Sequence, residues 1–260
     1  MNQTALITGA SNGIGLELAK LLAQDNIDLL LTARSEDKLK QLQQELTNEY
    51  KVKVYIIKCD LSEIDSAKTL YEEVKNLGLN IDILINNAGF GDFGRFTETD
   101  WGKEQQMIQL NMTSLTQLTK LISKDMIKTS GGKIMNVAST AAFQAGPLMA
   151  VYYATKAYVL YFSEAIAHEL KDNNITVTCL CPGPTESGFQ AATGNEKSKL
   201  VKGKKLPTSK EVAKYGYKAM KKGKVVAIHG TLNYVMVNAS RFLPRNIVTD
   251  IVYKAQIEAN

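Results

Sequence analysis

Short apolar runs alternate with longer segments, in which apolar residues recur every three or four positions, through the first 180 residues of the chain. The short runs favour strands, and the longer segments favour amphipathic helices. Residues 29–31 and 83–85 are consecutive apolar residues, as is typical of strands that are covered on both faces. We predict seven strands, at residues 4–8, 27–33, 53–58, 81–86, 132–137, 175–181 and 225–228.

Helices are predicted in the segments between the strands. Ser35 is placed to cap one helix and Ser62 to cap the next, with Asp65 three residues later in a near capping box. Longer helices are expected over residues 100–127 and 150–170. Because strands that alternate with helices pair in parallel and cross over with a right hand, we expect an α/β fold with a doubly wound, seven-stranded parallel sheet.

One domain is expected over residues 1–260, because no repeat, Pro-rich linker or low-complexity block divides the chain. After Cys181 the periodic pattern weakens, and residues 182–207 follow neither a helical nor a strand period. Long segments without periodicity inside a compact domain are often functional. We therefore predict a mobile lid over about residues 183–207.

The composition excludes several classes of protein. With 45% hydrophobic and 22% charged residues among 260, the chain is not disordered as a whole. Three cysteines are too few for a disulfide scaffold, and the two histidines lie far from any cysteine pair, so we expect no metal site. No charged leader precedes the first strand and no run of 18 apolar residues occurs, so we expect a cytoplasmic protein without a membrane partner.

The positive charge of the chain is concentrated in one segment. Residues 195–224 hold eleven lysines and two acidic residues, a net charge of +9, so the rest of the chain carries −4 of the total of +5. A lysine-rich segment without interleaved arginines is usually a solvated surface, and we expect no nucleic-acid partner. The alternative is a patch that steers an anionic substrate.

A glycine-rich turn directly follows the first strand and opens a helix. Gly9 permits a tight turn, Gly13 allows backbone amides to approach a pyrophosphate, and Gly15 allows close packing of the helix on the strand. The spacing is Gly-x-x-x-Gly-x-Gly, which matches neither the P-loop nor the commoner Gly-x-Gly-x-x-Gly pattern. A turn without a ligand is the alternative. Three further residues of the turn are expected at the cofactor, namely Ser11, Asn12 and Ile14.

The end of the second strand indicates which nicotinamide cofactor binds. A carboxylate there would bond the adenosine ribose, but this chain has Arg34 and Ser35 and no acidic residue before Glu36. Because Arg34 can pair with a 2′-phosphate, we predict NADP(H), the alternative being an exposed surface charge. Asp60, followed by Leu61, is placed to accept from the adenine amino group, or equally to begin a helix.

The spacing Tyr-x-x-x-Lys occurs three times, at residues 71/75, 152/156 and 217/221. It brings a phenol and an ammonium to one helix face, where the cation favours the phenolate. We interpret the first and third pairs as solvated faces. Only Tyr152 and Lys156 follow a strand that ends near a serine, Ser139, and ligands of such sheets lie at the carboxyl ends of strands.

Together these motifs resemble the short-chain dehydrogenase/reductase family over about the first 190 residues. The ordered set is the glycine turn, Asn87-Ala88-Gly89 after Asn86, Asn111, Ser139, Tyr152-x-x-x-Lys156, and Pro182-Gly183. Within this family, the local sequences around Cys181 and Arg34 look most like those of a bacterial group of uncertain substrate. That group is related to 3-oxoacyl and hydroxysteroid reductases. The resemblance implies a Rossmann fold that binds NAD(P).

The resemblance also implies roles for particular residues. Tyr152 would be the general acid in carbonyl reduction and the base in alcohol oxidation, and Lys156 would lower its pKa and bind the nicotinamide ribose. Ser139 would hydrogen-bond the substrate oxygen, and Asn111 would hold a helix kink and a water. The cofactor would also contact Asn87, Ala88, Gly89, Pro182, Gly183 and Thr185.

Two positions depart from the family pattern. Ser187 stands where the family often has threonine, and Asn12 stands where many NADP-preferring members have Lys or Arg. The prediction of NADP(H) therefore depends on Arg34.

We predict an NADP(H)-dependent oxidoreductase that interconverts a carbonyl and a secondary alcohol. The alternative is a non-catalytic NADP(H)-binding sensor, which has no need of an acid matched to an oxygen ligand. A homodimer or homotetramer is expected through the helices at 100–127 and 150–170. The predicted walls of the substrate pocket are Phe143, Leu148, Met149 and Phe189.

Overall fold

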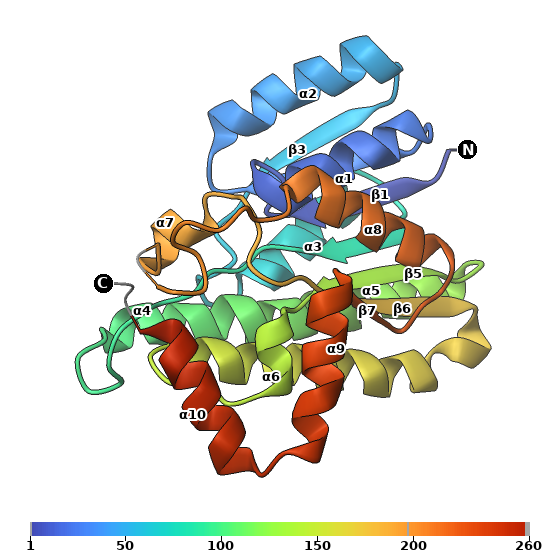
Figure 1. Cartoon of the computed structure of the whole chain (residues 1–260). Coiled ribbons are helices and arrows are strands. Elements are labelled where there is room, and N and C mark those ends of the chain that lie inside the picture. Colours follow the sequence, from blue (N-terminus) through green and yellow to red (C-terminus); the bar gives the residue numbers. More distant parts are fainter. Residues whose placement is uncertain (1, 197, 258–260) are drawn as a thin grey trace.

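A parallel β-sheet forms the middle layer of the protein (Figure 1). The computed structural model describes residues 2–196 and 198–257, and within them seven strands lie in the order β3-β2-β1-β4-β5-β6-β7. Every neighbouring pair is parallel, which confirms the predicted doubly wound α/β fold. The strands are β1 Thr4–Thr8, β2 Asp28–Ala33, β3 Val54–Lys58, β4 Ile83–Asn86, β5 Gly132–Val137, β6 Ile175–Cys181 and β7 Val226–Ile228.

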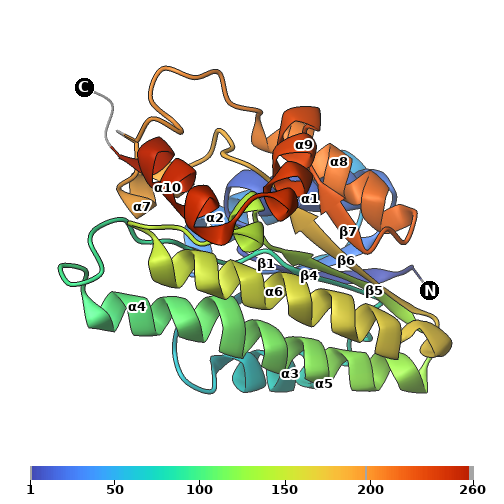
Figure 2. The ribbon, with the colours of Figure 1, turned by 60° about the horizontal axis from the view of Figure 1, so that its bottom comes forward.

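Helices cover both faces of this sheet, and Figure 2 shows α4, α5 and α6 along one of them. On the opposite face the apolar sides of α1, α2 and α8 pack against the sheet, with residues such as Leu18, Leu39 and Val212 fully buried. The helices are α1 Gly13–Gln24, α2 Glu36–Tyr50, α3 Ser66–Asn76, α4 Trp101–Ile108, α5 Leu115–Lys128, α6 Ala150–Glu169, α7 Phe189–Thr193, α8 Ser209–Lys221, α9 Thr231–Ala239 and α10 Arg245–Gln256. Among the described residues, no helix is both long enough and apolar enough to cross a membrane.

The predicted helix over residues 100–127 is present, with one irregularity. A π-helical segment, η1 (Gln109–Ser114), joins α4 to α5 without a break in the helical course. Such segments are rare and frequently lie at functional sites. Asn111 lies within it and is only 1% exposed.

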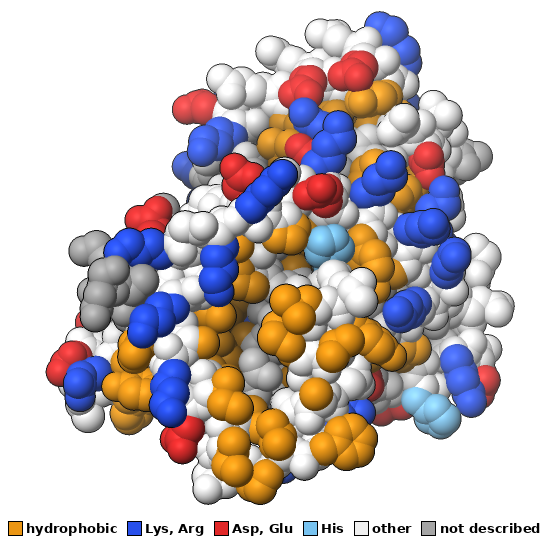
Figure 3. Space-filling view, in the orientation of Figure 1, with side chains coloured by type: hydrophobic (Ala, Val, Ile, Leu, Met, Phe, Trp, Pro, Cys, Tyr) orange, Lys and Arg blue, Asp and Glu red, His pale blue; other side chains and the backbone are white. Residues whose placement is uncertain are grey.

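The segment after β6 contains more structure than its sequence pattern predicts. Residues 189–193 form α7, and a bridge pairs Glu186 with Thr208. Helix α8 then begins with a capping box, in which Thr208 and Glu211 each bond the backbone of the other. The ten lysines of residues 198–224 are exposed, as expected for a solvated surface (Figure 3), and Lys197 lies outside the described residues.

The prediction that Ser62 caps a helix is wrong. The Ser62 hydroxyl and backbone N–H both donate to Oδ1 of Asp60, at 2.6 and 3.0 Å. This local turn uses the side chain that would have capped the helix. Helix α3 therefore begins at Ser66, after Asp65 in the left-handed conformation with φ of 60°.

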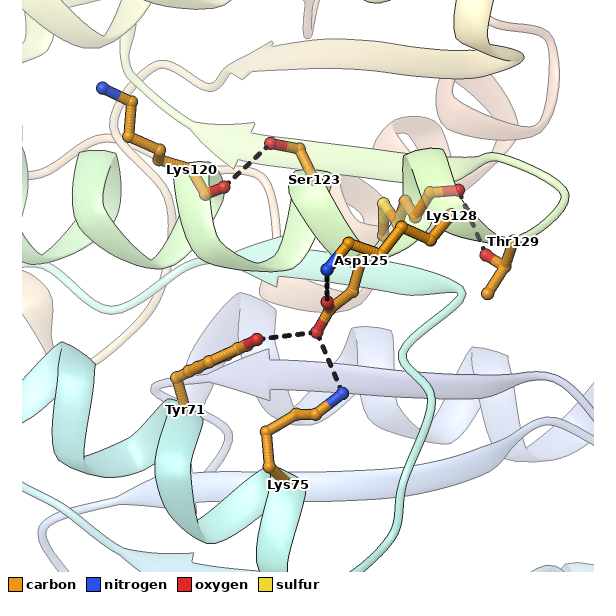
Figure 4. Close-up of polar contacts among 8 residues, drawn as sticks. Tyr71, Lys75, Lys120, Ser123, Asp125, Lys128 and Thr129 are labelled. Carbon is orange, nitrogen blue, oxygen red and sulfur yellow. Dashed lines mark hydrogen bonds and ion pairs between the residues drawn. The ribbon is translucent and has the colours of Figure 1, made fainter.

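The interpretation of Tyr71 and Lys75 as a solvated face is also wrong. The Tyr71 hydroxyl donates to Oδ2 of Asp125 at 2.8 Å, and Nζ of Lys75 lies 3.1 Å from the same oxygen (Figure 4). Asp125 belongs to α5, so the pair joins α3 to α5 across 54 residues of sequence. The role of these residues is structural.

Tyr217 and Lys221 make the corresponding contact on the other face of the sheet. Tyr217 is 8% exposed, and its hydroxyl donates to Oδ2 of Asp25 at 2.7 Å. Nζ of Lys221 lies 2.7 Å from the same carboxylate oxygen, and Asp25 is the residue at the C-terminal end of α1. The pair therefore holds α8 against α1 and is not a solvated face.

We expect Asp25→Ala to lower the free energy of unfolding by about 1 kcal/mol, the usual contribution of such a hydrogen bond. The bonds from Lys221 and Tyr217 hold the pKa of Asp25 below its ordinary value. The contribution of the ionised Asp25 carboxylate to the free energy of unfolding is therefore complete above about pH 4. It is lost as the pH falls through the lowered pKa. Chemical denaturation at pH 7 and at pH 3 measures it, with exposed Glu98→Ala as the control. An equal loss of stability at both pH values would contradict the assignment.

Candidate active site

A cavity of about 760 Å³ opens at the carboxyl ends of the strands, where the strand order changes direction between β1 and β4. Ligands of open α/β sheets bind at this position. Of the predicted site residues, Gly15 and Asn111 lie behind the cavity wall. The others line it: Gly9, Ser11, Asn12, Gly13, Ile14, Arg34, Ser35, Asp60, Leu61, Asn87, Ala88, Gly89, Ser139, Tyr152, Lys156, Pro182, Gly183 and Thr185.

The glycine turn has a left-handed backbone, which favours glycine, at two positions. Gly9 has φ of +65°, and a Cβ there would lie 2.8 Å from Nδ2 of Asn87 and 2.9 Å from Cα of Ala88. Gly13 has φ of +57° and is the first residue of α1. Gly15 is buried, and a Cβ there would collide with Asn87 and the Gly9 carbonyl, which explains its packing role.

The start of α1 suits a bound anion. Asn12 precedes the helix without capping it through its side chain, and the first turn carries no acidic residue. The amide N–H groups of this turn and the positive end of the helix dipole therefore remain available to a phosphate. These features, with the bare surface at Gly9 and Gly13, fit the pyrophosphate of a dinucleotide.

Hydrogen bonds fix the loop after β4 against this turn. The Thr8 hydroxyl accepts from the backbone N–H groups of Asn87 and Ala88, each at 3.0 Å. The Asn87 side chain donates in return to the carbonyls of Thr8 and Gly9. The cavity floor is thus built from strands β1 and β4 together.

Arg34 and Ser35 lie at the cavity rim after β2, as predicted. Arg34 is exposed, and the Ser35 side chain makes no capping bond to α2. Lys38, one helical turn further on, also lines the cavity and was missed by the sequence reasoning, although its i+4 spacing from Arg34 was a usable signal. Two cations, Arg34 and Lys38, therefore lie at this rim of the cavity.

Tyr152, Lys156 and Ser139 come together in the wall of the same cavity. Nζ of Lys156 donates to the carbonyl of Val137 at 2.8 Å and lies 5.8 Å from the centre of the Tyr152 ring. Oγ of Ser139 donates to the carbonyl of Pro182 at 3.4 Å, and Ser139 lies near enough to Tyr152 to influence its pKa. The backbone N–H of Ala141 donates to Oγ of Ser139 at 3.1 Å and fixes its position.

The sequence predicts a lowered pKa for Tyr152, whereas its surroundings in this structure raise the pKa. Burial raises this pKa, and Ser139 only partly opposes the change. Burial also lowers the pKa of Lys156 to about 8, because the ammonium is removed from water. In this arrangement the ammonium of Lys156 is turned toward Val137, and burial has the largest effect on the pKa of Tyr152.

Asn111 connects the π-helical segment to the site. Its Nδ2 donates to the carbonyl of Phe90 and to the Thr155 hydroxyl, both at 3.0 Å, and its Oδ1 accepts from the N–H of Phe90. A Cβ on Gly89 would lie 3.0 Å from Oδ1 of Asn111 and 3.3 Å from Nζ of Lys156. Asn111 thus lies directly behind Gly89 and beside Lys156.

Comparison with known families is decisive at this point. The model of the short chain dehydrogenase family matches residues 3–198. The chain belongs to the short-chain dehydrogenase family. It is therefore an enzyme of a family whose members are dehydrogenases and reductases that act on CH–OH groups.

Several characterised dehydrogenases resemble this one over most of its length. The 3-oxoacyl-[acyl-carrier-protein] reductase FabG of Aquifex aeolicus is 31% identical over 75% of this chain and 78% of its own. A short-chain dehydrogenase from Sphingobium yanoikuyae, solved in complex with NADPH, superposes with a TM-score of 0.82 at 27% identity and 98% coverage of both chains. The bulky-bulky ketone specific alcohol dehydrogenase from Comamonas testosteroni gives a TM-score of 0.79 at 27% identity and 92% coverage of both chains.

The substrate side of this dehydrogenase includes residues that the sequence reasoning missed. Met149 and Phe189 line the cavity as predicted, and the Phe189 ring lies 5.4 Å from that of Tyr152. Phe143 and Leu148 are not among the lining residues, because Phe143 packs into a separate apolar cluster and Leu148 adopts a positive φ of 68°. The helices α9 and α10 and the turn between them supply the additional wall, with Met236, Val237, Leu243, Val248, Ile251 and Val252. The sequence analysis did not predict α9 and α10, although the apolar residues in these segments could have indicated two further helices.

Proposed function

We propose that the protein is an NADP(H)-dependent carbonyl reductase whose reverse reaction oxidises a secondary alcohol. The observation that supports this most strongly is that Tyr152, Ser139 and Lys156 share one cavity with the glycine turn and Arg34. In this proposal residues 1–260 form one dinucleotide-binding domain, and residues 183–207 cover the cavity.

Arg34 and Lys38 would hold the adenosine phosphate, and the start of α1 would hold the pyrophosphate. The nicotinamide of the bound cofactor supplies the hydride. Arg34 pairs with a phosphate through two parallel N–H groups, which a ribose hydroxyl cannot match. This is the basis for the preference for NADPH over NADH.

Tyr152 would give its proton to the substrate oxygen. Hydride addition to a ketone develops negative charge on that oxygen, which a proton donor and a second hydrogen bond stabilise. Because burial raises its pKa, Tyr152 is protonated at neutral pH, as a general acid for reduction must be. The Ser139 hydroxyl lines the same cavity as Tyr152 and would supply the second hydrogen bond to the same oxygen.

An NADPH-consumption screen tests the proposal. The panel includes aldehydes, bulky apolar ketones, 3-oxoacyl thioesters and sugars, and cofactor binding is measured separately by NADPH fluorescence. We expect that NADPH binds to the protein and that it is oxidised in the presence of at least one class of carbonyl compound. Binding without oxidation across the panel would instead support a dinucleotide sensor.

We also propose that the enzyme is a homodimer or homotetramer. On the two long helical stretches of the described chain, the exposed large apolar residues are Trp101, Ile127 and Tyr161. A larger group lies over α9 and α10 (Figure 3) and comprises Leu232, Tyr234, Val235, Met236, Phe242, Leu243, Ile247, Ile251 and Tyr253. Light scattering on the purified protein measures the number of subunits.

A further inference from the structure

Two side-chain amides lie in the substrate wall with unused hydrogen-bonding capacity. Gln256 of α10 is fully buried and lines the cavity, yet its Oε1 has no hydrogen-bond partner among the described residues. Asn195, just after α7, is 8% exposed and lines the same cavity, and its Oδ1 is also unpartnered there. Buried polar atoms are nearly always paired, so two unpaired acceptors in one cavity require an explanation.

The surroundings of these amides do not require polar residues for the fold. Tyr153, to which Gln256 is bonded, packs in an apolar cluster with Met107, Met149 and Val252. Nδ2 of Asn195 has only a long contact of 3.9 Å to the sulfur of Met149. An unsatisfied buried acceptor destabilises the fold, and an apolar residue at either position would avoid that cost.

Tyr153 connects this pair of amides to the reacting end of the cavity. Nε2 of Gln256 donates to the Tyr153 hydroxyl at 2.8 Å, and the ring centres of Tyr153 and Tyr152 are 6.1 Å apart. Because the hydroxyl oxygen accepts from Gln256, its own proton remains available for donation. Burial raises the pKa of Tyr153 to about 12, so this proton is retained at neutral pH.

The donors and acceptors at this place define the group that fits. Two amide oxygens accept hydrogen bonds, the Tyr153 phenol donates, and Nδ2 of Asn195 can also donate. A hydroxyl group can donate to an amide oxygen and accept from Tyr153 at the same time. A carboxylate only accepts and would face both amide oxygens without a donor of its own, so it does not fit.

We propose that Gln256, Asn195 and Tyr153 form a second substrate subsite, which binds a hydroxyl group located away from the reacting carbonyl. This inference rests on the proposed function and deepens it. The remaining walls from α9, α10 and the turn between them are mostly apolar, as Met236, Leu243 and Val252 show, with Asn233 and Ser240 as polar exceptions. The substrate class is therefore a bulky, largely apolar ketone that carries a separate hydroxyl group.

Kinetics with matched ketones test the subsite. The probes are a polycyclic hydroxyketone, the same ketone without the hydroxyl, and the analogue with a carboxylate in its place. We expect the wild-type enzyme to prefer the hydroxyketone by about 5- to 10-fold in kcat/KM, mainly through KM, as suits one hydrogen bond remote from the reacting carbon. Gln256→Met, which keeps the size of the side chain, should reduce this ratio to about 1 and leave kcat/KM for the ketone without the hydroxyl unchanged.

Gln144→Met is the matched control, since Gln144 is another cavity-lining glutamine and lies outside the subsite. It should keep the wild-type ratio. Calorimetry measures the affinity of the same ketones for enzyme loaded with NADP⁺, on which a ketone is not reduced. A failure of the proposed catalysis can therefore be distinguished from a failure of the proposed subsite. Equal affinity of the wild type for the two ketones, an unchanged ratio in Gln256→Met, or a preference for the carboxylate would each overturn the proposal.

Discussion

Tyr152→Phe should lower kcat by about 10²- to 10⁴-fold, the range in which a positioned general acid contributes. The substitution removes the only group of Tyr152 that can protonate the substrate oxygen and leaves the ring and its contact with Phe189 in place. NADPH should still bind, because the glycine turn and Arg34 are unchanged. Stopped-flow measurement of NADPH oxidation with the best ketone of the screen, together with NADPH fluorescence, measures both quantities.

The chain offers its own matched controls for this substitution. Tyr71 and Tyr217 have the same Tyr-x-x-x-Lys spacing, but their hydroxyls are bonded to Asp125 and Asp25. Tyr71→Phe and Tyr217→Phe should therefore reduce stability slightly and keep kcat. If Tyr152→Phe retained full turnover, Tyr152 would not be the acid.

Arg34→Ala should raise the KM for NADPH by about 10- to 100-fold, which corresponds to the 1.5–3 kcal/mol of a hydrogen bond to a charged group. The KM for NADH should change little, because NADH carries no 2′-phosphate. Steady-state kinetics with each cofactor at a saturating ketone concentration measures the two values. The expected result is loss of cofactor preference without loss of kcat.

Lys40→Ala is the control for this experiment. Lys40 lies on the same helix, α2, is exposed, and is paired with Glu36 at 2.7 Å. Its removal should alter neither KM. A parallel rise of both KM values in Arg34→Ala would show that Arg34 supports the fold of the cavity rim and does not recognise the phosphate.

The seven strands were predictable because the signal for each is local. Consecutive apolar residues such as Leu29, Leu30 and Leu31 favour a strand covered on both faces wherever it lies, and all three are fully buried. The four strands whose predicted bounds differ from the observed ones all begin one or two residues later, where the ladder of hydrogen bonds begins. The glycine turn was predictable for the same reason, since its strand, turn and helix are contiguous.

Features that depend on distant segments were not predictable. The partner of Tyr217 lies 192 residues away, and nothing in the neighbourhood of Tyr217 in the sequence indicates that Asp25 will meet it. Ser62 has the residue type of a helix cap, but Asp60 competes for its hydroxyl only once the turn has formed.

By itself, the amino-acid sequence determined the order of the strands along the chain, the glycine turn after the first strand, and the choice of the serine, tyrosine and lysine that line the cavity. The tertiary structure alone decided how deeply Tyr152 and Lys156 are buried and hence the direction in which each pKa moves. It also decided that α9 and α10 close the cavity and bring Gln256 to Tyr153, 103 residues away. The physical reason is that backbone periodicity is a property of neighbouring residues, whereas desolvation and side-chain pairing arise only when remote segments exclude water together.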